Sequence, residues 1–444
     1  NGSSFINNGQ LRAEAGSSIR LEGSGVFQFN APAIAGDGAA ILLGVGTISG
    51  SIGSEGSGEI RPIGVTNNCQ LVNLTNLGTL TIPSGYSVAT RGSIVNEGVI
   101  AMNGASQASS IIVRDNTLLT GEGALTMSNS RANIIRAAVS SQDITFDIGQ
   151  TIEGAGQIGF NSIALRISPG GSVNATLSEG IELDAFFTLE NNGQIRASGG
   201  NILVRPTPTF TSTGSIIADA GRLVQFSLTT LRQNAGVIVV NGEVQVDNDE
   251  LLLRGGRITG TGLIDSSVDN TNGIIAPGSS TADQASYGVL SIEGHYSQSV
   301  VGATRIDIAG PALGTEHDQL AISGTANLGG LLRIRFADGF DPGAGDVYDI
   351  VTASSITGGY DSIMTENVPP TAEVGVSILS DRVRVTVGAR CPADFDRDGG
   401  VTGADIGAFF ADYEQGQPGA DLDQDGGITG NDIAEFFSHY EAGC

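Results

Sequence analysis

The chain has 444 residues, enough for two to four domains of ordinary size. It carries 21 basic and 47 acidic residues, a formal net charge of −26, and every basic residue is arginine. The absence of lysine excludes P-loop, Schiff-base and kinase-type lysine chemistry, and the negative charge argues against a nucleic-acid partner. Hydrophobic residues make up 40%, so the chain is expected to fold, and no apolar run is long enough for a membrane helix.

Residues 1–285 consist of a repeated strand-and-turn pattern. A phrase of the form Asn/Ser-x-Gly-x-aliphatic recurs, with steps of 20 (Gly78 to Gly98), 21 (Gly193 to Gly214) and 22 (Gly214 to Gly236) residues. A period near 20 without helical patterning predicts a parallel β-solenoid, or β-helix, whose coils stack about 4.8 Å apart. About 14 coils would form a rod roughly 65–70 Å long, with asparagines stacked in its turns. The alternative is a β-sandwich of unrelated strands, which the even spacing disfavours.

Residues 286–390 have longer strands and turn signals such as Asp338-Gly339, which predict an antiparallel β-sandwich or an irregular end-cap of the solenoid. Three segments around this boundary resemble the end of autotransporter-like passenger repeats: residues 273–280 (GIIAPGSS), 288–294 (GVLSIEG) and 317–326 (HDQLAISGTA). The resemblance covers roughly residues 260–390 and implies a β-helix that is secreted or displayed on a cell surface. The chain starts at Asn1 without a charged-then-apolar leader, so we expect a secreted chain that has lost its signal peptide.

Two twelve-residue stretches within residues 391–444 have the spacing of a calcium loop. Each has Asp at positions 1, 3, 5 and 12, Gly at positions 6 and 7, and Thr at position 9. The expected ligands of the first loop are Asp394, Asp396, Asp398, Gly400 (through its carbonyl), Thr402 and Asp405. Those of the second loop, 27 residues later, are Asp421, Asp423, Asp425, Gly427 (through its carbonyl), Thr429 and Asp432. Because Ca²⁺ takes six to eight oxygen ligands, the sequence predicts two Ca²⁺ ions.

Each loop leads into one predicted helix, at residues 406–413 and 433–440, and position 12 is Asp where a full EF-hand has Glu. This duplicated loop-helix unit resembles a type I dockerin, and its Gly-Cys ending resembles dockerin variants of planctomycete secreted proteins. The resemblance implies a small α-helical calcium module with a cohesin-like partner. Loop positions 10 and 11, Gly403-Ala404 and Gly430-Asn431, depart from the hydrophilic pair that contacts cohesin in that family.

Cysteines bracket this module. A disulfide between Cys391 and Cys444 is expected, because a unit of about 54 residues is too small for a large core. Closing such a loop is worth roughly 4 kcal/mol in the chain-entropy model. The remaining cysteine, Cys69, is expected to be a buried apolar residue.

We do not expect an enzyme, and no catalytic residue is assigned. A β-solenoid hydrolase would place paired carboxylates on one strand face, but solvated turns account better for the acids with that spacing. These are Asp247 with Asp249 and Glu182 with Asp184. The three histidines have no zinc-site spacing; they are His295, His317 and His439.

The expected protein is therefore mainly β: a solenoid rod (1–285), a sandwich or end-cap (286–390) and a dockerin-like calcium module (391–444). We expect it to be a secreted structural protein, extracellular or on the cell surface, that assembles head-to-tail into a filament or stands as a rod. The alternative is a surface adhesin or scaffold component anchored through its module to a cohesin-like partner. A polysaccharide-active β-helix enzyme is the third reading, and polysaccharide is considered as a contact; neither nucleic acid nor a membrane span is expected.

Overall fold

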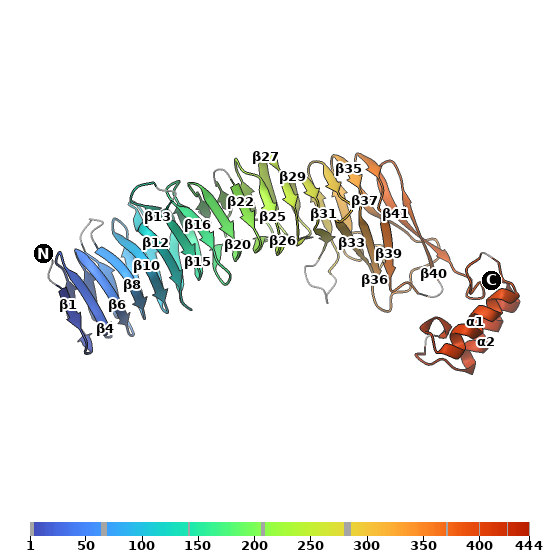
Figure 1. Cartoon of the computed structure of the whole chain (residues 1–444), viewed down its shortest axis with the longest axis horizontal. Coiled ribbons are helices and arrows are strands. Elements are labelled where there is room, and N and C mark those ends of the chain that lie inside the picture. The colour runs from blue at the N-terminus through green and yellow to red at the C-terminus, as the bar shows by residue number, and fades with distance from the viewer. Residues whose placement is uncertain are drawn as a thin grey trace.

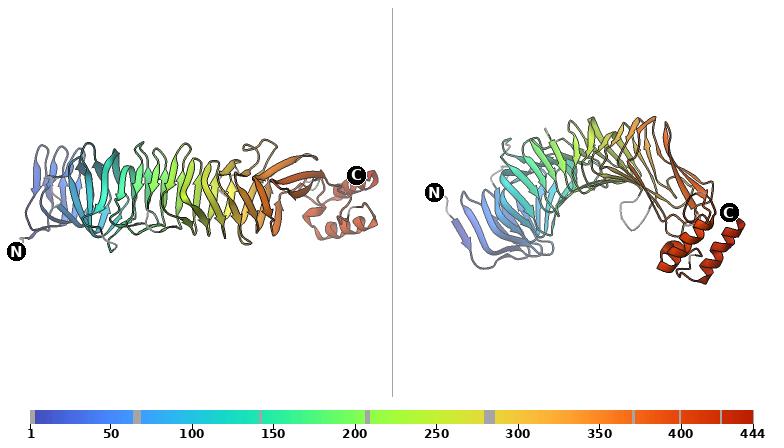
Figure 2. Two further views of the ribbon diagram at one scale, coloured as in Figure 1. Left: turned by 90° about the horizontal axis from the view of Figure 1, so that it is seen from above. Right: turned by 45° about the vertical axis from the view of Figure 1, so that its right-hand side comes forward.

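The computed structural model describes residues 4–63, 69–140, 143–205, 209–278, 286–369, 372–398, 400–423 and 425–443. It is a long, curved rod of stacked strands with a small helical module beyond its C-terminal end (Figure 1). Seen from another side the rod forms an arch (Figure 2). The predicted parallel β-solenoid is confirmed, because nearly all strand pairs along the rod are parallel.

Each coil contributes strands to three parallel ladders, which form the three faces of the rod. Along the first face each strand pairs with the next in the order given. These strands are β3 (Ser18–Leu21), β5 (Ala40–Leu43), β7 (Glu59–Pro62), β9 (Thr79–Pro83), β11 (Val99–Asn103), β13 (Ala124–Ala137), β15 (Thr151–Gly159), β17 (Ser172–Ala175), β20 (Gln194–Ala197), β23 (Ser215–Ala218), β26 (Val237–Val240), β28 (Arg257–Gly260), β30 (Ile274–Pro277), β33 (Ala303–Ile308), β36 (Leu331–Phe336) and β39 (Ser362–Glu366).

The second face is built in the same way and includes the C-terminal parts of β13 and β15. Its other strands are β1 (Ser4–Asn7), β4 (Val26–Ala35), β6 (Gly46–Ser54), β8 (Cys69–Asn76), β10 (Ser87–Asn96), β12 (Ser109–Thr120), β18 (Ile181–Leu183), β21 (Ile202–Val204), β24 (Leu223–Phe226), β27 (Glu243–Leu253), β29 (Leu263–Asn270), β31 (Val289–Ile292), β34 (Gln319–Ile322) and β37 (Val347–Thr352).

The third face continues the long strands β4, β6, β8, β10, β12, β27 and β29 around a corner. Its remaining strands are β2 (Leu11–Ala13), β14 (Thr145–Ile148), β16 (Ala164–Ile167), β19 (Thr188–Asn191), β22 (Thr209–Ser212), β25 (Leu231–Gln233), β32 (Tyr296–Gln298), β35 (Thr325–Leu328) and β38 (Ser355–Gly358).

One apolar core fills the rod. Side chains alternate inward and outward along each strand, so that in β26 Ile238 and Val240 are buried while Val237 and Val239 are only partly covered. The inward aliphatic residues of successive coils form a single cluster that extends from Leu21 to Val387. No coil could bury these residues alone, so the stacking itself stabilises the fold.

Buried polar side chains stack at the corner between the third and first faces, as expected for the repeated asparagines. Asn76 and Asn96 are fully buried, and the Nδ2 of Asn76 donates to the Oδ1 of Asn96 at 2.7 Å. Farther along the rod the Nδ2 of Asn191 donates to the Oγ of Ser212 at 3.0 Å. These bonds join neighbouring coils and satisfy groups that the turns place inside the rod.

The solenoid does not end at residue 285, and the sandwich alternative for residues 286–390 is wrong. The strands from β31 to β39 continue the parallel ladders, with longer coils: Leu331 pairs with Ser362, a step of 31 residues, whereas Gln194 pairs with Ser215, a step of 21. The extra residues form loops outside the ladders, such as residues 337–346, and these loops break the regular period on which the boundary was based.

The end-cap alternative is correct for the last two strands. A hairpin of β40 (Ala372–Ile378) and β41 (Arg382–Ala389) pairs antiparallel onto β37 and closes the second face. Val383 and Val385 of β41 are fully buried in the core. The carboxylate of Asp349 binds Arg384 (2.7 and 3.0 Å) and Arg382 (2.9 Å), which fixes β41 across β37.

The C-terminal module contains α1 (Gly403–Gln415), the 3-10 turn η1 (Pro418–Ala420) and α2 (Gly430–Ala442). Both helices start three residues before the expected positions, because each is capped by the threonine of its loop. The module has a core of its own, in which the rings of Phe409 and Phe436 stack 4.3 Å apart. In the described part of the chain, no helix is long and apolar enough to cross a membrane.

Candidate metal centres

The first acidic loop brings three carboxylates together. Oxygens of Asp394, Asp396 and Asp398 lie within 4.8 Å of one another. The backbone N–H of Asp398 donates to Asp394 at 3.1 Å and to Asp396 at 3.2 Å, and these bonds hold the turn tight. Asp405 lies outside this group: its two oxygens accept from the backbone N–H groups of Asp396 (3.0 Å) and Thr402 (2.7 Å).

The second loop repeats this architecture with one difference. Its group consists of Asp421, Asp423 and Asp432, so the carboxylate at position 12 belongs to the group and Asp425 does not. Asp432 accepts from the backbone N–H of Leu422 at 2.8 Å. The Oδ2 of Asp421 accepts from Gly426 at 3.1 Å, whereas its Oδ1 is buried without a hydrogen-bond partner.

The helices position the last carboxylate of each loop. Thr402 and Thr429 cap α1 and α2, and the residue three positions later, Asp405 or Asp432, bonds back to the cap as a capping box. Both aspartates are fully buried. Burial opposes their ionisation, but the backbone N–H donors outweigh it and hold the pKa of Asp405 and of Asp432 below the ordinary value.

At position 3 of each loop the carboxylate has a raised pKa, in contrast to position 12. Burial raises the pKa of Asp396, and its neighbours Asp398 and Asp405 add repulsion. At Asp423 the hydrogen bond from Asp425 lowers the pKa, but burial and the surrounding carboxylates outweigh it, and the pKa is raised. Crowded carboxylates of this kind are stabilised by a cation, so an ion would relieve the repulsion in both loops.

The residues fit calcium. The clustered donors are all oxygens, which hard cations prefer, and the buried Oδ1 of Asp421 lacks a partner that an ion would supply. Gly400 and Gly427 donate their N–H groups to Asp398 and Asp425, and the contact of their carbonyls with an ion stays a prediction. The threonine hydroxyls act as helix caps, and their contact with an ion stays a prediction.

The expected disulfide is not tested, because Cys444 lies outside the described residues. Cys69 is a buried free thiol, 3% exposed, as expected. Burial raises the pKa of Cys69 to about 12, so its thiol stays protonated.

Two of the other candidate acids, Glu182 and Asp247, have structural partners. Glu182 is not in a solvated turn: it is buried and binds Arg131 (2.5 Å) and Arg205 (3.2 Å). Asp247 accepts from the Nε2 of Gln225 at 2.8 Å, and the side chain of Asp249 lies outside the described residues. Each histidine has its own contact, and none joins a metal-competent group within the described ranges; their partners are Thr325 for His295, Gly310 for His317 and Glu435 for His439.

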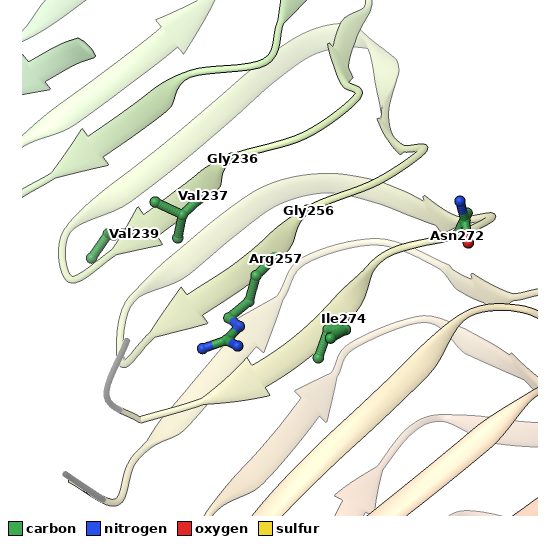
Figure 3. A pocket seen from close by; sticks show the side chains of 7 residues that line it. All are labelled: Gly236, Val237, Val239, Gly256, Arg257, Asn272 and Ile274. Atoms are coloured by element: carbon green, nitrogen blue, oxygen red, sulfur yellow. The ribbon is translucent and has the colours of Figure 1, made fainter. Parts of the chain in front are cut away.

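A hollow of about 570 Å³ lies on the outer surface of the first face (Figure 3). Val237 and Val239 come from β26, Arg257 from β28 and Ile274 from β30. Its side chains are mainly aliphatic, and Arg257 is the only charged residue of the lining. It therefore offers no pair of groups for acid–base or nucleophilic chemistry.

Sequence reasoning missed the role of two arginines at the first loop, one shortly before it and one within it. Arg390 and Arg397 line a hollow together with Asp394 and with Glu373 of the hairpin. The position of Arg397 within the loop was visible in the sequence, but its grouping with β40 depends on the fold.

Comparison with family models and with curated proteins finds no match for this chain. The class is therefore defined by the fold alone: a parallel β-solenoid that carries two C-terminal helices with acidic loops.

Proposed function

We propose that the chain is a non-catalytic, extracellular structural protein: a rigid β-solenoid rod with a calcium-stabilised attachment module. The observation that carries the proposal is the order of parts along the chain. A rod with one continuous core ends in an antiparallel hairpin, and the acidic loop-helix module follows beyond this cap. Figure 1 shows the module projecting from the end of the rod, where a partner could reach it.

Calcium would be held in the first loop by Asp394, Asp396 and Asp398, and in the second by Asp421, Asp423 and Asp432. The ion supplies positive charge to the crowded carboxylates of the module, and its binding energy adds to the stability of the folded state. The finer features proposed with it are secretion, a dockerin-like partner contact and the Cys391–Cys444 disulfide. An extracellular location supports the disulfide, because oxidising compartments allow such bonds to persist.

A filament that assembles head-to-tail is the second candidate. Its support is the outer edge of β39, where Ile363 and Met364 are 41% and 44% exposed. An exposed apolar edge strand can accept another strand. The hairpin on β37 restricts such stacking to the first and third faces, so we favour a single rod attached through its module.

Thermal unfolding of the module in calcium and in excess chelator tests the proposal. We expect the helical signal near 222 nm to melt at a higher temperature in calcium, and the double variant Asp421→Asn/Asp423→Asn to lose most of this gain. The matched control is Asp412→Asn, an aspartate of α1 outside the metal groups. Equal melting with and without calcium would exclude the calcium module.

Negative-stain electron microscopy of the same samples separates the two candidates. Single rods in calcium support attachment through the module, whereas long fibres would favour the filament. Alkylation under denaturing, non-reducing conditions tests the disulfide, because one reactive thiol, Cys69, is expected rather than three.

A further inference from the structure

The two acidic loops differ in which carboxylates they bring together. In the second loop the position-12 carboxylate of Asp432 already lies with Asp421 and Asp423, and the buried Oδ1 of Asp421 has no partner. In the first loop the group consists of positions 1, 3 and 5, and the position-12 carboxylate of Asp405 contacts the side chain of Asp396. Each group therefore holds three carboxylates, and only the second includes the position-12 ligand.

The loops also differ in their surrounding charge. Arg390 and Arg397 line the same hollow as Asp394, with Glu373 of β40 as the other acid of the lining. Arg397 occupies position 4 of the first loop, where the second loop has Gln424. No arginine or lysine follows Arg397 in the sequence, so the second loop lies in a stretch without either.

The two arginines differ in their surroundings. Arg390 is partly buried, and burial lowers its pKa, with repulsion from Arg397 as the next cause. Arg397 is exposed but has a left-handed backbone with φ 65°, which only a minority of non-glycine residues adopt. A guanidinium held beside a cation site reduces the affinity of that site for a divalent ion.

We propose that the loops bind calcium unequally: the second loop fills first, and the first loop fills at higher calcium because Arg390 and Arg397 repel the ion. The inference rests on the calcium binding proposed above. At roughly 8 Å in water, one exposed guanidinium lowers affinity for a divalent ion roughly fivefold, and salt weakens this effect. The second ion is then structural, while the first loop, which shares its hollow with the hairpin, responds to calcium level at the joint between rod and module.

Calorimetric calcium titration of the full chain tests this proposal, and the duplicated loops supply matched variants. We expect two binding steps, with Asp421→Asn removing the tighter step and Asp394→Asn the weaker one. Arg397→Gln copies the residue of the second loop and should tighten the weaker step about fivefold. Gln424→Arg should weaken the tighter step by a similar factor, and high salt should reduce both shifts. Far-UV circular dichroism checks that each variant keeps its helices.

Two equal steps, or a weaker step that Arg397→Gln leaves unchanged while the helices persist, would overturn the inference and leave calcium binding intact. If Asp394→Asn removes the tighter step, the order of filling is reversed and the inference is also wrong. If the native chain shows no binding at all, the proposed calcium module itself fails, and the inference falls with it.

Discussion

Replacing Asn96 by alanine should open the coils around it. Asn96 is fully buried, accepts from the Nδ2 of Asn76 at 2.7 Å and donates to the carbonyl of Ala124 at 3.1 Å. Asn96→Ala removes both bonds and leaves that carbonyl without this donor. The Nδ2 of Asn76 still donates to the carbonyls of Gly78 and Val99, so it is not left unsatisfied. We therefore expect the local free energy of unfolding to fall by about 2–3 kcal/mol.

Hydrogen exchange measured by mass spectrometry suits this rod, because a solenoid opens locally rather than all at once. A loss of about 2–3 kcal/mol corresponds to exchange about 30- to 150-fold faster in peptides from β10 and β11, since 1.4 kcal/mol is tenfold. Coils near β26 should be unaffected.

Asn30→Ala is the matched control, because Asn30 is exposed and its side-chain partners among the described residues, Asn8 and Gln28, are exposed as well. We expect its effect to stay within about 0.5 kcal/mol. If Asn96→Ala behaves like Asn30→Ala, the buried asparagines do not stabilise the stacking and this account of the corner is wrong.

Three further predictions follow from buried or paired groups. Burial raises the pKa of Asp318 to about 8, above its ordinary value of 3.8. The folded chain therefore holds an extra proton between these values, and its stability should fall as pH rises from 3.8 to about 8. Asp318→Asn should remove this slope in exchange or melting data, and an unchanged slope would exclude Asp318 as its cause. The pKa of Asp349 is lowered, chiefly by the hydrogen bond from Arg384, so the ionised Asp349 stabilises the fold above pH 3.8 and this stabilisation is lost as pH falls. Asp349→Asn should therefore speed exchange in β40 and β41 at pH 7. Protection equal to that of the native chain would show that the ion pairs do not hold the cap. Cys69 should resist iodoacetamide at pH 8 until urea is added, whereas labelling of the native chain would contradict its burial.

Local sequence signals were sufficient for the regular part of the fold. The Asn-x-Gly phrase marks a turn that must recur once per coil, so the spacing of its glycines gave both the solenoid and its period. The acidic loops were equally predictable, since ligand type and spacing are fixed by calcium coordination. The apolar pattern marks each helix three residues late, because capping by Thr402 and Thr429 starts the helices earlier.

The missed features depend on contacts that are distant in sequence. The sequence does not reveal that the solenoid continues beyond residue 285, because loops outside the ladders hide the repeat period. The ladders nevertheless continue there, since Leu331 pairs with Ala303. Glu182 was assigned to a solvated turn because its partner Arg131 is 51 residues away. The grouping of Arg390 with Glu373 requires β40 and β41 to pair as a hairpin, which places Glu373 opposite Gly388.

Stacking in register gives the rod a length that changes in fixed increments. Each coil adds about 4.8 Å along the axis and pairs with its neighbours through the same three ladders. Duplication or loss of one repeat of about 21 residues would lengthen or shorten the rod by one such increment, leaving the hairpin and the module unchanged. The number of repeats therefore sets the distance from the first coil of the rod to its C-terminal module.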